Sequence, residues 1–283
     1  MIRMLLVLVW LAAALHAQTT LWKVTYGGKT LYIGGTVHML RASDYPLPKA
    51  YDHAFEAADV LVFETDISAV ESPQFALQVQ RRLMFGPKKH LGDVLRDDTY
   101  AKLERYAARN GIPMERFDRM KPQLVAVTIA NLELLRIGMD RPGVDRFYFG
   151  RASQRGKAVR WLEDPVEQIA ILEAMGRDDE EGMVRQSLEA IGEYKNMMDS
   201  MLTAWRNGDA ASLERLGKKY LMHESPADYR RLIVDRNRRW MVKLKQMLRS
   251  RETELVLVGA LHLVGPEGLI AQLKRRGYRV EQL

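Results

Sequence analysis

The sequence predicts an α/β protein with a central mixed, mostly parallel sheet, an N-terminal β-hairpin, a cover of helices and a large helical insertion. Short apolar runs such as Val60–Phe63 are bounded by charged residues, which is typical of buried strands. Segments with helical spacing separate these runs, an alternation that favours a sheet covered by helices. Gly27-Gly28 joins two alternating segments, a pattern that indicates a two-residue hairpin turn.

Alternating or apolar runs with turn residues on both sides predict six strands. They are, in chain order, Leu21–Thr25, Thr30–Ile33, Val60–Phe63, Ala158–Leu162, Leu255–Val258 and Tyr278–Val280. Helical spacing predicts the elements between them. These are Lys49–Ala58, Glu71–Asn110 with a break at Gly86-Pro87, Lys121–Ile137, Val144–Gln154, Pro165–Ser250 with breaks near Gly176, Gly208 and Ser225-Pro226, and Pro266–Arg276. Leu124–Leu135 is almost entirely apolar, which predicts a core helix.

The chain has 283 residues, of which 47% are hydrophobic and 28% charged, enough for one domain with a sizeable core. Met1–Ala17 has an early arginine, an apolar run and small residues near its end, which predicts a signal peptide. Residues 18–283 then form a single domain, periplasmic or secreted, with no stable membrane span after cleavage. The alternative is an uncleaved N-terminal anchor.

Charge and cysteine content narrow the function classes. The net charge of +7 is spread along helices without a nucleic-acid motif, so it indicates solvated helix faces rather than nucleic-acid binding. Contact with an anionic envelope surface is the weaker alternative. The absence of cysteine leaves His, Asp, Glu and Asn as metal ligands. The sequence contains no HExxH and no Gly-x-Ser-x-Gly motif.

Two segments share the pattern of a strand followed by Gly-x-x-His. Leu31–Leu40 alternates, breaks at Gly34-Gly35 and reaches His38, while Leu255–Val258 leads through Gly259 to His262. We expect the fold to bring both strand ends together in one polar site. Two imidazoles and a carboxylate form a ligand set that leaves metal positions open for water or substrate. The alternative is that both histidines are structural.

Two glutamates also follow predicted strands. In open α/β sheets polar sites gather at the carboxyl ends of the strands. Glu64 comes directly after Val60–Phe63, and a carboxylate at that depth needs a cation or hydrogen-bond donors. Glu163 has the same placement but also precedes a helix start. For Glu64 the alternative is a salt bridge to an arginine.

Polar residues on predicted helices complete the candidates. Asn237 falls on the apolar stripe of its helix and Arg236 borders that stripe, so each fits either a site or a contact between helices. Asp145 lies at a helix start, where a carboxylate is usually a cap, and Asp66 is expected to be a cap or a partner of the site residues.

The chain resembles the TraB/GumN family, which is related to the Tiki proteins. The matching pieces are GGTVH (34–38), LVFETD (61–66), KPQL (121–124), GVD (143–145), WLEDPVEQ (161–168), DRN (235–237) and VGALHLVGPEGL (258–269). The resemblance implies a divalent-metal-dependent hydrolase or protease whose site contains His38, His262 and Glu64. Some related folds bind haem or hydrolyse lactones.

The leading hypothesis is hydrolysis of a peptide or ester bond in a peptide or small-molecule substrate. His38 and His262 would hold a divalent ion (Mn, Co or Zn), with Glu64 as third ligand or as base. Glu163, Arg236 and Asn237 would orient the substrate or stabilise the oxyanion. One alternative is a non-catalytic envelope protein that binds metal, haem or glycan in the same cleft, and another is a helical interaction protein.

Overall fold

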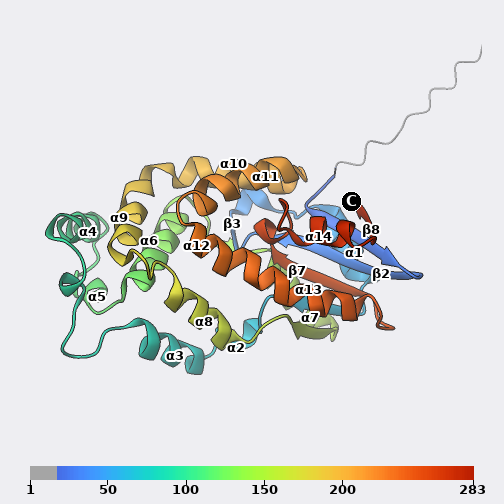
Figure 1. Cartoon of the computed structure of the whole chain (residues 1–283), viewed down its shortest axis with the longest axis horizontal. Coiled ribbons are helices and arrows are strands. Elements are labelled where there is room, and N and C mark those ends of the chain that lie inside the picture. Colours follow the sequence, from blue (N-terminus) through green and yellow to red (C-terminus); the bar gives the residue numbers. More distant parts are fainter. Residues whose placement is uncertain (1–17) are drawn as a thin grey trace, which may run out of the picture.

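The computed structural model describes residues 18–283, which form a six-stranded sheet with helices around it (Figure 1). The strand order is β6-β4-β7-β2-β1-β8. The first four strands are mutually parallel, and β1 pairs antiparallel with both β2 and β8. The predicted α/β class with a mixed, mostly parallel sheet is therefore confirmed. The predicted signal peptide, Met1–Ala17, lies outside the described residues.

All six predicted strands are present, with ends that differ by a few residues. They are β1 (Leu21–Tyr26), β2 (Lys29–Thr36), β4 (Val60–Phe63), β6 (Ala158–Trp161), β7 (Glu254–Gly259) and β8 (Arg279–Gln282). Positive φ angles of 54° at Gly27 and 80° at Gly28 form the predicted hairpin turn between β1 and β2. A small sheet that the sequence did not predict pairs β3 (Met39–Leu40) with β5 (Arg141–Pro142).

Helices occupy most of the remaining chain. The α-helices are α1 (Lys49–Ala57), α2 (Ile67–Val70), α3 (Pro73–Leu83), α4 (Asp97–Arg109), α5 (Glu115–Asp118), α6 (Pro122–Arg136), α7 (Val144–Arg155), α8 (Pro165–Ala174), α9 (Glu180–Glu189), α10 (Tyr194–Arg206), α11 (Ala210–Gly217), α12 (Pro226–Tyr229), α13 (Asp235–Met247) and α14 (Leu269–Arg275). Short 3₁₀ turns are η1 (Ala42–Asp44), η2 (Leu91–Asp93), η3 (Ala190–Glu193) and η6 (Ala260–His262), and η4 (Lys218–Met222) and η5 (Arg230–Val234) are π-helical. No helix within residues 18–283 is long and apolar enough to cross a membrane.

The buried apolar residues form two clusters. The larger one includes the sheet and the helices against it. The smaller one joins η2, α4, α5, α6 and α9, which we call the helical lobe. Figure 1 shows the lobe at the end of the molecule opposite the sheet. The predicted insertion between Glu163 and Leu255 is present as α8 to α13, but the lobe combines its helix α9 with helices from earlier in the chain.

The predicted break at Gly34-Gly35 is wrong, because both glycines lie inside β2. A Cβ on Gly34 would come within 2.8 Å of the Tyr51 ring, and one on Gly35 within 2.5 Å of the Thr20 methyl group. The two glycines therefore do not form a turn. They allow neighbouring groups to approach the extended strand closely, because glycine has no Cβ.

Helix α6 is less buried than its apolar sequence predicted. Val125 and Ile129 are fully buried, whereas Leu135 is 49% exposed. Leu134 and Leu135 instead line a cavity beside the sheet. Some apolar residues of α6 therefore line a cavity instead of packing in the core. The periodicity of a single sequence does not distinguish these two environments.

Candidate functional site

The predicted convergence of strand ends is confirmed. Strands β2 and β7 are parallel neighbours with Thr36 opposite Gly259, so the chain leaves both strands at the same edge toward His38 and His262. Strand β4 lies on the other side of β7 and is followed by Glu64. The backbone N–H of Glu163, just beyond β6, donates to the carbonyl of Glu64 at 2.9 Å.

Arg236 of α13 lies at the centre of these residues and is 7% exposed. Its Nε and Nη2 donate to Glu163 Oε1 at 3.0 and 2.6 Å, and Nη2 also donates to Glu64 Oε2. Nη1 lies 3.1 Å from His262 Nε2 and 3.3 Å from the carbonyl oxygen of Leu232. These contacts engage all five N–H groups of the guanidinium. Arg236 is therefore a buried, fully satisfied cation.

Asn237 fixes the orientation of His262, which is 4% exposed. Asn237 Oδ1 lies 2.7 Å from His262 Nδ1. Asn237 Nδ2 donates to the backbone carbonyl oxygens of His262 and Glu267 at 3.0 and 2.9 Å. The pattern assigns the proton to Nδ1 and leaves the Nε2 lone pair facing Arg236. Burial lowers the pKa of His262 to about 3, so the ring is neutral at physiological pH.

Glu64 is held as a carboxylate. Burial opposes its charged form, but the nearby charge of Arg236 and a hydrogen bond from the N–H of Gly259 to Oε1 at 2.6 Å favour it. The net result lowers the pKa of Glu64 to about 2. At neutral pH this side chain is an anion that binds protons weakly.

His38 and Asp145 form a second pair at the same edge. His38 Nδ1 lies 2.8 Å from Asp145 Oδ2, and the imidazole is 64% exposed. The negative charge of Asp145 and its hydrogen bond raise the pKa of His38 to about 9. Asp145 is not a helix cap, since the N-terminus of α7 at Gly143 has no side-chain cap. The open choice between cap and site is thus resolved in favour of a contact with His38.

We expect the His38–Asp145 pair to stabilise the fold at neutral pH and less so at alkaline pH. The folded pKa is raised, so the stabilisation is fully present below pH 6.5 and is lost as pH rises through about 9. The effect is small because solvent screens the exposed ring. Urea unfolding of the wild type and Asp145→Asn should give a difference that shrinks over this window. A difference independent of pH would contradict the expectation.

A cavity of about 700 Å³, which we call the strand-end cavity, opens beside these residues. His38, Glu64 and Asp145 line it, together with apolar side chains from α2, α6 and α10. Thr36 and Thr65 also line it; they are 3% and 8% exposed, and within residues 18–283 their hydroxyls have no hydrogen-bond partner. A buried hydroxyl without a partner is unfavourable, so these two groups would gain from a hydrogen bond if a side-chain movement brought them to the cavity surface.

The predicted site residues therefore divide into two sets. His38 and Glu64 line the cavity. Glu163, Arg236, Asn237 and His262 are 7% exposed or less and form a network behind Glu64. Asp66 accepts from the N–H of Ala69 as the N-cap of α2, as expected. Thr36 and Thr65 were not predicted from the sequence, although Thr36 lies in the motif GGTVH.

The predicted metal ligands do not fit a shared ion as they lie. Glu64 Oε2 and His262 Nε2 both contact the Arg236 guanidinium. His38 Nδ1 is engaged by Asp145. Among the described side chains no group of three or more His, Cys, Asp or Glu could hold a metal ion. A divalent ion between Glu64 and His262 would need the space that the guanidinium fills.

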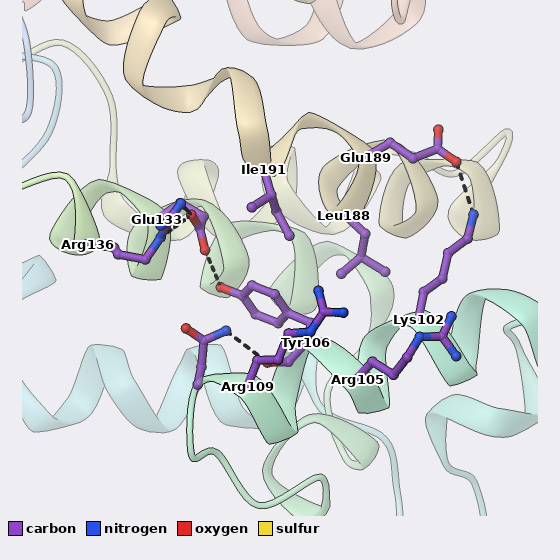
Figure 2. Close-up of a pocket in the computed structure, with 10 residues that line it drawn as sticks. Lys102, Arg105, Tyr106, Arg109, Glu133, Arg136, Leu188, Glu189 and Ile191 are labelled. Atoms are coloured by element: carbon purple, nitrogen blue, oxygen red, sulfur yellow. Dashed lines mark hydrogen bonds and ion pairs between the residues drawn. The ribbon is translucent and has the colours of Figure 1, made fainter.

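A second cavity, of about 560 Å³, lies in the helical lobe (Figure 2). Its charged residues are partly paired with one another: Lys102 lies 3.2 Å from Glu189, and Arg136 lies 2.7 Å from Glu133. None of the predicted site residues lines this cavity. Of these two cavities, the strand-end cavity is the one lined by predicted site residues, His38 and Glu64.

Comparison with known proteins agrees with the motifs. The model of the TraB/PrgY/gumN family matches residues 20–282. The chain is 25% identical over 251 residues to the uncharacterized protein YbaP of Escherichia coli (strain K12). The aligned region covers 88% of this chain and 89% of YbaP. YbaP of Shigella flexneri matches with the same identity and coverage.

Proposed function

The chain belongs to the TraB/PrgY/gumN family, as its motifs predict, and we propose that this member hydrolyses a peptide or ester bond in the strand-end cavity. The observation that carries the proposal is the position of His38, Glu64 and Asp145 at one cavity of about 700 Å³. That volume lies in the usual range for ligand sites, which are mostly apolar with a few polar groups.

The apolar cavity walls favour a substrate that has an apolar group beside the scissile bond. Phe63, Leu134, Met198 and Met201 line the cavity with other apolar side chains. Methionine adapts its shape to different apolar ligands, so the walls favour a class of substrates over one rigid molecule.

His38 is the residue we assign to proton transfer. Asp145 engages Nδ1, which orients the ring and leaves Nε2 for a water molecule. A pKa of about 9 leaves only a small neutral fraction of His38 at pH 7, so turnover should increase as the pH rises toward 9. In this neutral form His38 accepts a proton from the water as the water attacks the carbonyl carbon. The resulting imidazolium, stabilised by Asp145 and by the nearby charge of Glu64, returns the proton to the leaving group.

The buried network positions Glu64. Arg236 holds one oxygen of the Glu64 carboxylate, and Glu163 and His262 hold Arg236 in turn. All five N–H groups of Arg236 are engaged, so its role is to position Glu64 rather than to donate to the substrate. With a pKa of about 2, Glu64 supplies a fixed negative charge and not the base.

Thr36→Val should separate activity from stability. The hydroxyl of Thr36 has no partner within the described part of the chain, so we assign it to the substrate carbonyl. Valine keeps the shape and removes an unsatisfied buried group, so we expect unchanged or higher stability, by up to about 1 kcal/mol. Loss of a donor to the oxyanion should lower kcat by about tenfold or more. Thermal unfolding and steady-state kinetics measure both, and equal kcat values for wild type and variant would contradict the assignment.

The test of the proposed function is a hydrolysis assay on the mature protein with a panel of fluorogenic peptides and aryl esters that carry apolar groups. We expect turnover by the wild type and its loss in His38→Gln. The matched control is His53→Gln, because His53 is an exposed histidine of α1 that does not line the cavity. Turnover that survives in His38→Gln, or binding of these compounds without cleavage, would overturn the proposal; the second outcome would favour a binding protein.

Hydrolysis is proposed to take place outside the cytoplasm. The support is the predicted signal peptide, Met1–Ala17. Cell fractionation and mass spectrometry test this: we expect the protein in the periplasm or medium with Gln18 as its first residue. An intact N-terminus in a membrane fraction would favour the uncleaved anchor.

A further inference from the structure

We infer that Arg236 is the resident cation of the buried network beside the strand-end cavity and occupies the position that a divalent metal ion would need. The inference deepens the proposed function, because it concerns the charge balance of the same site. It is carried by the donor atoms around the guanidinium.

Those donor atoms are of the kinds that bind zinc, manganese or cobalt. Glu64 Oε2 and Glu163 Oε1 both contact Nη2, the second at 2.6 Å, and His262 Nε2 lies 3.1 Å from Nη1. Two carboxylates and one neutral imidazole form a common ligand set for these ions. All three donors converge on one small volume from three separate segments of the chain.

The imidazole is also held as a metal-bound histidine is usually held. Its Nδ1 is engaged by Asn237 Oδ1 at 2.7 Å, which fixes the tautomer and directs the Nε2 lone pair inward. Metal ligands commonly have such a hydrogen bond on the second ring nitrogen. Here the lone pair meets a guanidinium N–H instead of a metal.

Arg236 is buried, and its surroundings do not favour a metal ion next to the guanidinium. The side chain of Arg236 is 9% exposed, and its guanidinium carbon lies 4.5 Å from the centroid of the Trp240 ring. All five N–H groups of the guanidinium are engaged. An ion added beside this cation would meet its charge at short range, and the carboxylate oxygens of Glu64 and Glu163 are already engaged by N–H donors. The native centre is therefore electrostatically closed to a divalent ion, and removal of the guanidinium should open it.

The experiment compares metal binding by the wild type and Arg236→Met. Both proteins are dialysed, exposed separately to Mn²⁺, Co²⁺ and Zn²⁺, and analysed for bound metal and for Tm. For the wild type we expect well under one equivalent of each ion after removal of free metal, and an unchanged Tm. For Arg236→Met we expect a lowered Tm without metal, about one bound equivalent, and a rise of about 5 °C or more at metal concentrations near a hundred times Kd.

Arg231→Met is the matched control. Arg231 donates to Asp228, which is 4% exposed, at 2.8 Å, so this variant also removes a guanidinium from a buried carboxylate. Within the described residues the second carboxylate near Arg231, that of Asp178 at 3.5 Å, is 74% exposed, and no imidazole contacts this guanidinium. We therefore expect no rise in Tm with metal in this variant.

Stoichiometric metal in the wild type, or a rise in its Tm with any of the three ions, would overturn the inference. So would a folded Arg236→Met that gains neither metal nor stability. If Arg236→Met does not fold, the wild-type measurements still decide. Neither readout involves a substrate, so absence of turnover in the hydrolysis assay would count against the proposed function alone.

Discussion

Glu163→Gln is expected to lower the free energy of unfolding by about 3 kcal/mol, because the change leaves a buried cation short of one carboxylate. Glu163 is 3% exposed and accepts from Arg236 at 2.6 and 3.0 Å. Glutamine keeps the shape but supplies no charge, and Glu64 alone would then balance the guanidinium. Urea unfolding followed by tryptophan fluorescence measures the difference.

The control for Glu163→Gln is Glu167→Gln on the next helix. Glu167 is 52% exposed and lies 3.8 Å from Arg239, so its loss should change stability by no more than about 0.5 kcal/mol. Equal midpoints for Glu163→Gln and the wild type would mean that the buried network contributes little. The assigned role of Arg236 in positioning Glu64 would then lose its energetic basis.

Gly143→Ala is expected to cost about 3 kcal/mol of stability and to reduce hydrolysis. A Cβ at Gly143 would lie 2.3 Å from the carbonyl groups of Val37 and His38, which are backbone atoms and cannot rotate away. The φ angle of −71° suits alanine, so the effect is steric rather than conformational. Relief of the clash must separate α7 from the segment that carries His38, and hence Asp145 from its partner.

The same helix offers a matched control in Gly150→Ala. A Cβ at Gly150 would meet nothing within 4 Å, and alanine favours the helix, so we expect unchanged or higher stability by up to about 1 kcal/mol. Thermal unfolding and the hydrolysis assay on both variants measure the contrast. If both variants behaved alike, the close approach at Gly143 would not hold the His38–Asp145 pair in place.

Local sequence patterns were sufficient to predict the fold class, the six strands and the edge of the sheet where the polar residues gather. The reason is local: buried parallel strands are short apolar runs, as in Val60–Phe63, and the residue after each run must leave at the carboxyl edge. Glu64, Glu163, His38 and His262 were found in this way. The interior placement of Asn237 followed equally from helical periodicity.

Which of these residues contact one another, and which face the cavity, depends on the packing of segments that are distant in the chain. Asp145 pairs with His38 from 107 positions away, and Arg236 fills the space among Glu64, Glu163 and His262. Neither contact leaves a local signal, because each depends on how α7 and α13 pack against the strand ends. The role of Gly34 and Gly35 inside β2 likewise depends on Tyr51 and Thr20, which approach from other segments. Local sequence determines elements through periodicity, while the charge balance of a buried site is set by side chains that only the packing of distant segments brings together.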